Sequence, residues 1–134
     1  MVKPFAVEFI SDKKGRGLIA KEPIKKGSIV ETAHVLVLSE DDYVKIQETL
    51  LYGYIFEWDL GEPRTYAIAL NDIEFINHSS SHPNVDYTFD YPGKKIIFKA
   101  TADIAPGDEI TFNYNCHGRE NDAPLWFDIE DCDS

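Results

Sequence analysis

Apolar and polar positions follow one another in short runs along most of this chain. Six runs are rich in β-branched or aromatic residues and end at Gly, Pro, Asn or Asp, a pattern typical of β-strands. The predicted strands cover residues 5–10, 28–39, 65–70, 85–91, 94–101 and 109–114. The sequence YPGKK predicts a hairpin turn between the fourth and fifth of them. A mostly-β fold is therefore expected.

One stretch changes to helical spacing. Ser39 and Asp42 form a capping-box-like pattern that predicts a helix start. The apolar residues that then recur at helical spacing are Tyr43, Ile46 and Leu50. We expect one short helix that fades near Gly53, followed by irregular chain over YIFEW, residues 54–58.

Two segments of the chain repeat one pattern. Residues 20–30 and residues 100–110 align without gaps as A-x-x-x-I-x-x-G-x-x-[VI]. Gly27 and Gly107 can supply the positive φ that a tight turn needs, and Pro106 presets the backbone before the second turn. The repeat predicts two equivalent kinked strand pairs, built into small folded-over sheets.

Charge and cysteine content limit the classes of partner. With 134 residues the chain is expected to form one domain over residues 1–127, followed by an acidic tail over residues 128–134. Its net charge of −11 disfavours nucleic acid and anionic membranes and favours a Lys-rich partner, although acidity can also serve solubility alone. Two cysteines make no disulfide scaffold, so we expect a soluble cytoplasmic protein, with a nuclear location as an alternative.

An early glycine motif suggests close approach of the backbone to a ligand. Residues 15–20 match the dinucleotide pattern G-x-G-x-x-[GA] literally. That fold needs an apolar strand before the motif and a helix after it, whereas SDKK precedes it and Pro23 follows. The dinucleotide interpretation therefore fails, and a Gly-x-Gly turn remains.

The segment FINHSSSHPN, residues 75–84, places many hydrogen-bonding groups directly after an apolar run. His78 and His82 have helical metal-ligand spacing, but Pro83 disfavours a helix and no C-x-x-C pattern supports zinc. A Ser-His-acid catalytic triad is also disfavoured, because the sequence has no nucleophile-elbow motif and the residue beside the Ser and His cluster is Asn77 rather than an acid. We therefore expect no metal. The alternative to a functional site is a loop whose Asn and Ser groups hydrogen-bond to each other and to nearby backbone.

Taken in order, three motifs resemble those of the SET-domain family of protein-lysine methyltransferases. KGRGL resembles the glycine motif of the family, FINHSSSHPN its Asn-His-Ser…Pro-Asn segment, and IAPGDEITFNY its closing segment. The resemblance spans about residues 5–127 and is closest to minimal viral and bacterial members. It implies a β-clip fold of small curved sheets with a C-terminal pseudoknot, an exception to the rule against threaded chains.

The resemblance also implies functional residues and S-adenosylmethionine as cofactor. Tyr114 falls on the catalytic tyrosine. The residues implied in cofactor binding are Gly15, Arg16, Gly17, Asn77, His78 and Trp126, and those implied in the lysine channel are Tyr54, Phe112 and Phe127. The loop of the second motif carries one extra residue, Ser80 replaces a common cysteine, and the zinc-binding cysteine cluster of many members is absent from the sequence.

The implied reaction is methyl transfer to a neutral lysine amine of a basic protein, a histone or another. Phe112 stands where a tyrosine would restrict product methylation, so di- or trimethyl-lysine is expected. An inactive SET-like module that binds a Lys-rich segment is one alternative, and a β-clip domain that binds a sugar or small molecule is another. By analogy with minimal members, a homodimer is an alternative to a monomer.

Overall fold

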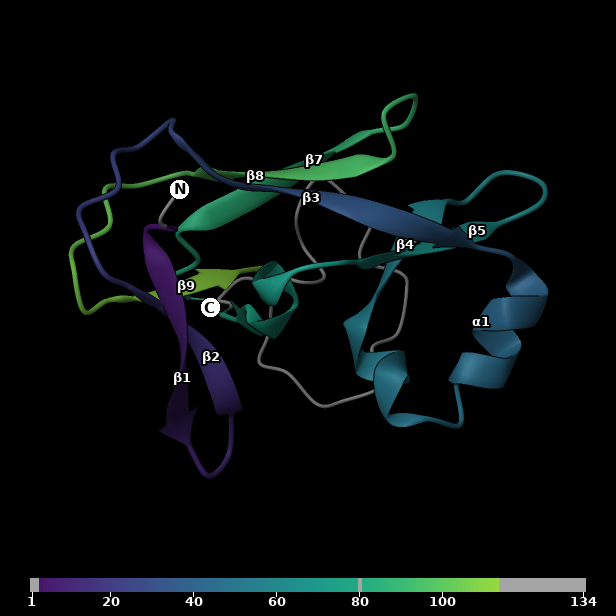
Figure 1. The fold of residues 1–134 in the computed structure, drawn as a ribbon, viewed down its shortest axis with the longest axis horizontal. Coiled ribbons are helices and arrows are strands. Elements are labelled where there is room, and N and C mark those ends of the chain that lie inside the picture. Colours follow the sequence, from purple (N-terminus) through teal and green to yellow (C-terminus); the bar gives the residue numbers. More distant parts are fainter. Residues whose placement is uncertain (1–2, 80, 114–134) are drawn as a thin grey trace. The chain divides into compact units, whose positions relative to one another are not determined.

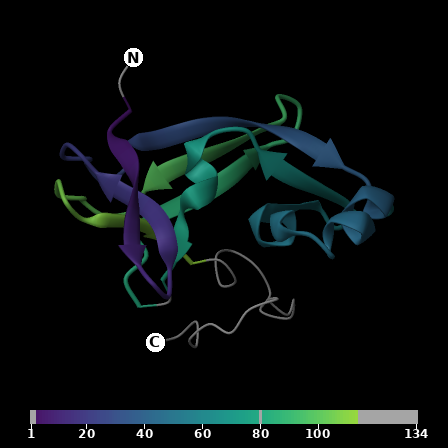
Figure 2. The same ribbon diagram turned by 60° about the horizontal axis from the view of Figure 1, so that its bottom comes forward.

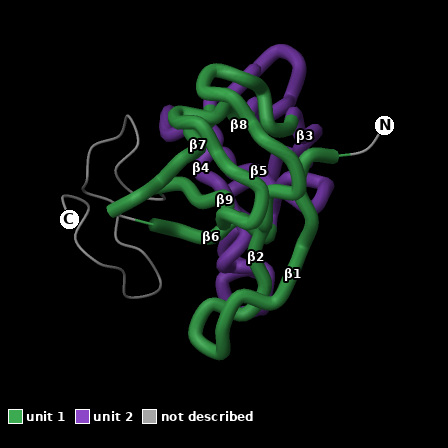
Figure 3. The backbone as a smooth tube through the Cα atoms, turned by 90° about the vertical axis from the view of Figure 1, so that its left-hand side faces the viewer, with its two compact units in different colours: residues 1–31, 75–87, 98–134 green, residues 32–74, 88–97 purple. Residues whose placement is uncertain are grey.

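The computed structural model describes residues 3–79 and 81–113 (Figure 1). These residues form strands and one α-helix, which confirms the expected mostly-β fold. The chain divides into two compact units, residues 1–31, 75–87 and 98–134 and residues 32–74 and 88–97 (Figure 3). No helix within the described ranges is long and apolar enough to cross a membrane.

The first unit is organised around the glycine motif. Strands β1 (Phe5–Ser11) and β2 (Gly15–Ala20) form an antiparallel hairpin, drawn in purple in Figure 2. Strand β9 (Glu109–Phe112) pairs antiparallel with β2, with fully buried Leu18 opposite Ile110. The expected Gly-x-Gly turn is thus only partly right, because Gly15 ends the turn at a φ of +71° and the rest of the motif is strand.

The two repeated segments bond to each other in a reciprocal pattern. Ile24 and Ile104 form an antiparallel bridge, with N–H···O distances of 2.9 and 2.8 Å in the two directions. Gly27 N donates to Ala100 O and Gly107 N donates to Ala20 O, both at 2.8 Å. The two glycines have φ values of +90° and +94°. The predicted turns are confirmed, and the repeat is explained by this mutual pairing.

Strand β9 runs between two segments that are close in sequence. Strand β6 (Asn77–His78) pairs with it in parallel, and Ser79 N donates to Phe112 O at 2.9 Å. Asn84 N donates to the neighbouring Thr111 O at 3.1 Å, just before β7 (Val85–Asp90) begins. Neighbouring residues of a strand direct their backbone groups to opposite edges. The segments on the two sides of this loop therefore bond to opposite edges of β9, so the loop crosses that strand. The C-terminal segment that the predicted pseudoknot would thread lies outside the described residues.

The second unit contains an antiparallel arrangement of β3, β5 and β4. Strand β3 (Ile29–Leu38) pairs with β5 (Thr65–Ala69), which pairs in turn with β4 (Ile55–Asp59). The expectation of irregular chain over YIFEW is wrong, because most of it forms β4. Ile55, Phe56 and Trp58 are buried there, and such a short apolar run shows no period that separates strand from loop.

The predicted hairpin turn at YPGKK is confirmed. It joins β7 to β8 (Lys95–Ala100), and Lys94 N donates to Tyr91 O at 3.2 Å. Lys94 has a φ of +55°. The turn therefore uses a lysine, and not the neighbouring glycine, at a left-handed position.

The predicted α-helix begins where expected and ends earlier. Helix α1 (Glu40–Ile46) has both bonds of the Ser39–Asp42 capping box, at 3.1 and 3.2 Å. Thr49 then bonds the Ile46 carbonyl through both its backbone N–H and its hydroxyl, which closes the helix. Leu50, expected on the apolar helix face, instead begins the 3-10 helix Leu50–Tyr54 and is 84% exposed.

Candidate functional site

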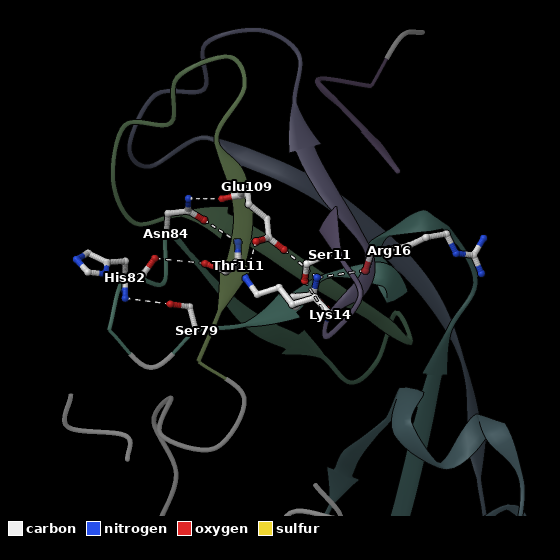
Figure 4. Close-up of polar contacts among 9 residues, drawn as sticks. Ser11, Lys14, Arg16, Ser79, His82, Asn84, Glu109 and Thr111 are labelled. Atoms are coloured by element: carbon white, nitrogen blue, oxygen red, sulfur yellow. Dashed lines mark hydrogen bonds and ion pairs between the residues drawn. The ribbon is translucent and has the colours of Figure 1, made fainter. Parts of the chain in front are cut away.

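Two motifs that are 61 residues apart in sequence meet in the first unit. The amide nitrogen of Asn77 on β6 donates to the backbone carbonyl of Arg16 on β2, at 3.2 Å. The same nitrogen donates at 2.8 Å to Oε2 of Glu109, the first residue of β9. Figure 4 shows the Arg16 and Glu109 side of this cluster. We call Arg16, Gly17, Asn77 and Glu109 the amide cradle.

Gly17 leaves room for the amide cradle to form. A Cβ at this position would lie 2.5 Å from Asn77 Nδ2 and 2.7 Å from Glu109 Oε2. Real Cβ atoms essentially never come this close to other heavy atoms. The glycine is therefore required because polar side chains approach its backbone, and not because of a positive φ. Gly15 is different: its Cβ would meet nothing within 4 Å, but its φ of +71° favours glycine.

Asn84 fastens the crossing loop to β9. Its Nδ2 donates to Glu109 O at 3.0 Å, and its Oδ1 accepts from Thr111 N at 2.9 Å. The Thr111 hydroxyl donates to His82 O at 3.3 Å, and His82 N donates to Ser79 Oγ at 3.1 Å (Figure 4). The Asn84 side chain thus bonds two backbone groups of β9 that a neighbouring strand would otherwise bond. The polar residues of the loop therefore hold it in place across β9.

Replacing Asn84 by Ala should destabilise the protein by roughly 2 to 4 kcal/mol, because two hydrogen bonds are lost and buried Thr111 N–H loses its acceptor. Urea unfolding measures this change. Asn84→Asp keeps the acceptor for Thr111 N–H but sets a carboxylate oxygen against Glu109 O in place of the donor, so it should also destabilise the protein at neutral pH. A loss below about 0.5 kcal/mol in the Ala variant would contradict this role.

The remaining predicted residues in the described ranges lie on several elements. Arg16 places its guanidinium carbon 4.4 Å from the centre of the Phe75 ring. His78 pairs with Phe112 across β6 and β9. Phe112 is buried, and its ring lies edge-on to the ring of Tyr87, with 5.6 Å between the two ring centres. Tyr54 ends the 3-10 helix of the second unit. The parts these residues play in binding stay predictions.

Three predicted residues, Tyr114, Trp126 and Phe127, lie outside the described residues. Among those that the structure does describe, no group of three or more His, Cys, Asp or Glu could hold a metal ion.

The quoted motif segments contain Lys14, Asn84 and Glu109, but none of the three residues was predicted to have a role. Lys14 Nζ lies 2.7 Å from Glu109 Oε1. The strand sequence EITF offered a signal, since the polar side chains of Glu109 and Thr111 alternate with the apolar side chains of Ile110 and Phe112. Nothing in the sequence paired Glu109 with residues more than thirty positions away.

The chemistry of the amide cradle fits a ligand with a cationic amine. Arg16 O and Glu109 Oε2 are both acceptors, so they fix which end of the Asn77 amide is nitrogen. The amide oxygen Oδ1 therefore faces away from them and can accept from an ammonium group. S-adenosylmethionine carries such a group on its amino-acid part, and its sulfonium supplies the methyl group.

Comparison with known proteins gives the same family as the motifs. The SET domain family model matches residues 15–115. A Schizosaccharomyces pombe histone-lysine N-methyltransferase, specific for H3 lysine-37, is 31% identical over 121 residues, which are 90% of this chain and 75% of that protein.

Solved structures share the fold. A structure from Plasmodium falciparum is 22% identical, with a TM-score of 0.64 over 87% of this chain and 96% of that one. Polycomb repressive complex 2 of Chaetomium thermophilum, bound to S-adenosylmethionine, is 25% identical with a TM-score of 0.71. That match covers 85% of this chain and 15% of the other.

The family model covers most of the chain, the yeast relative covers nearly all of it, and the glycine and Asn-His motifs meet in one cradle. The chain therefore belongs to the SET-domain family and is an S-adenosylmethionine-dependent protein-lysine N-methyltransferase.

Proposed function

We propose that this enzyme methylates a lysine in a Lys-rich segment of a basic protein, a histone in the first instance, and carries the product to di- or trimethyl-lysine. The observation that carries the product state is the position of Phe112. Strand β9 pairs this residue with His78, directly after Asn77 of the amide cradle. The side chain expected to decide the number of methyl groups is thus held beside the cofactor motif.

Support for a basic substrate comes from charge and from the yeast relative. The chain carries 24 acidic and 13 Lys and Arg residues, so its field attracts cationic segments and repels nucleic acid. The relative that matches 90% of the chain is named for methylation of histone H3. A lysine amine is mostly protonated at pH 7, a deficit of roughly 4.6 kcal/mol for a pKa of ~10.4. Apolar surroundings lower that pKa and favour the reactive neutral amine.

Phe112 supports higher methylation because it brings an apolar edge where tyrosine would bring a hydroxyl. The ring is 3% exposed and packs edge-on against Tyr87. A hydroxyl there, with any water it holds, would occupy space that a methylated amine needs. Space and polarity at this position thus decide how many methyl groups the amine accepts.

Phe112→Tyr should therefore stop the product at mono- or dimethyl-lysine while the first methylation continues at a comparable rate. Mass spectrometry of a methylated substrate over time measures the product distribution. Tyr87→Phe is the matched control, because it changes a hydroxyl on the neighbouring ring and should leave the distribution as in the wild type. Undiminished trimethylation by Phe112→Tyr would refute this role.

The substrate class is tested with isotope-labelled S-adenosylmethionine and purified core histones. We expect labelled methyl groups on histone lysine in the wild type and none with Tyr114→Phe. If another basic protein is labelled and the histones are not, that protein is the substrate and the histone assignment is wrong. A folded enzyme that binds the cofactor and labels neither would favour a module that holds Lys-rich segments without chemistry.

A further inference from the structure

The carboxylate of Glu109, in the closing motif, joins the Asn-His motif through Asn77 and the glycine motif through Lys14. Its Oε2 accepts from Asn77 Nδ2 at 2.8 Å, and its Oε1 lies 2.7 Å from Lys14 Nζ. Lys14 belongs to the turn between β1 and β2, where its backbone N–H donates to Ser11 Oγ at 3.1 Å (Figure 4). All of these residues lie within the first unit.

Glu109 has little freedom where it stands. Its side chain is 17% exposed, while that of Lys14 is 39% exposed. A carboxylate shielded from water is stabilised by a cation at hydrogen-bond distance, and charge-assisted hydrogen bonds are shorter and stronger than neutral ones. Lys14 therefore fixes one oxygen of Glu109, which leaves the other aimed at the Asn77 amide.

The orientation of the Asn77 amide depends on this arrangement. Arg16 O accepts one of its protons at 3.2 Å, and Glu109 accepts the other at the shorter distance of 2.8 Å. If Glu109 could rotate away, the longer bond to Arg16 would be left to hold the amide. The direction of the amide oxygen would then be less well defined.

We propose that Lys14 and Glu109 form a positioning pair that acts through Asn77. The pair holds the Asn77 amide so that Oδ1 faces the ammonium group of S-adenosylmethionine. Neither Lys14 nor Glu109 takes part in the chemical step. The proposal rests on the cofactor use of the family. It gives a role to Lys14 of KGRGL and to Glu109 of IAPGDEITFNY, to which the resemblance assigned none.

The test compares two probes by calorimetry, S-adenosylmethionine and 5′-methylthioadenosine, which lacks the amino-acid part. Lys14→Met and Glu109→Gln should each weaken binding of S-adenosylmethionine by about tenfold or more, the effect of one hydrogen bond to a charged group. Binding of methylthioadenosine should stay within about twofold, because Asn77 has no ammonium group to meet there. Lys14→Arg keeps the cation and should restore the affinity.

Lys3→Met is the matched control. The Lys3 side chain is 38% exposed, and its Nζ lies 3.8 Å from Glu31 Oε1. Lys3 precedes β1, at the end of the hairpin opposite the Lys14 turn. This variant should bind both probes as the wild type does. The double variant Lys14→Met/Glu109→Gln should be no weaker than the weaker single variant, since the two residues act as one unit.

Unchanged S-adenosylmethionine affinity in Lys14→Met would overturn the proposal, and so would an equal loss of both probes, which a purely structural role predicts. Lys14 is partly exposed on a turn, so this variant decides the question even if Glu109→Gln fails to fold. Wild-type protein that binds neither probe would contradict the cofactor site itself, and the positioning pair with it.

Discussion

Gly17→Ala should weaken S-adenosylmethionine binding by ~100-fold or more, because it takes away the space in which the amide cradle forms. The new methyl group would lie 2.5 Å from Asn77 Nδ2 and 2.7 Å from Glu109 Oε2. Both side chains must move, and their hydrogen bonds to each other and to Arg16 O are disturbed together. Losing one to two charge-assisted hydrogen bonds corresponds to this change in affinity. Calorimetry measures it.

Gly17→Ala should reduce cofactor affinity more than it reduces the free energy of unfolding. Extra volume in a packed site costs roughly 1 to 3 kcal/mol, and the displaced atoms here are side-chain atoms that can shift. Gly61→Ala is the control, because its Cβ would meet only Asp59 Oδ1, at 3.2 Å in an exposed loop. Cofactor affinity of Gly17→Ala equal to that of Gly61→Ala would show that the cradle plays no part in binding.

Glu74→Gln should stabilise the protein increasingly as pH rises. Burial raises the pKa of the Glu74 carboxyl from 4.5 to about 8, although a hydrogen bond from Ala69 N at 2.6 Å acts in the lowering direction. Between these two values the unfolded chain releases the proton that the folded chain keeps. The folded state therefore loses stability as pH rises through this window, and the cost is fully present above about pH 8.

Glutamine keeps an acceptor for Ala69 N–H and carries no charge, so the variant should lack this pH dependence. The pKa rise from 4.5 to about 8, at about 1.36 kcal/mol per pKa unit, corresponds to at most roughly 5 kcal/mol of unfolding free energy. Glu74→Gln should be more stable than the wild type by up to this amount above pH 8, and the difference should nearly vanish at pH 4. Urea unfolding from pH 4 to pH 9 measures both curves, with exposed Glu48→Gln as control. Parallel curves for wild type and Glu74→Gln would contradict this account.

Local signals in the sequence predicted those parts of the fold that local chemistry decides. The Ser39–Asp42 capping box places the helix start because both partners lie within one turn. Gly27 and Gly107 mark turns because only a left-handed backbone closes them there. The reciprocal bonds of the repeat follow from the same two segments, although the sequence alone did not show that they pair with each other.

What the sequence could not predict depends on partners distant along the chain. Residues 55–59 become a strand because β5 supplies their partners, and the run itself has no strand period. Leu50 has helical spacing from Ile46, but Thr49 closes the helix before it. Asn77 was found by resemblance, whereas Glu109 and Lys14 became visible only once folding placed them beside it.

The central claim is that the meeting of the glycine motif and Asn77 makes an S-adenosylmethionine site. Calorimetry of the wild type beside Asn77→Ala tests it without knowledge of the substrate. The account predicts micromolar-range binding that the variant weakens by at least about tenfold, the value of a hydrogen bond to a charged group. Folded wild-type protein that shows no binding, or a variant that binds as well as the wild type, would contradict it.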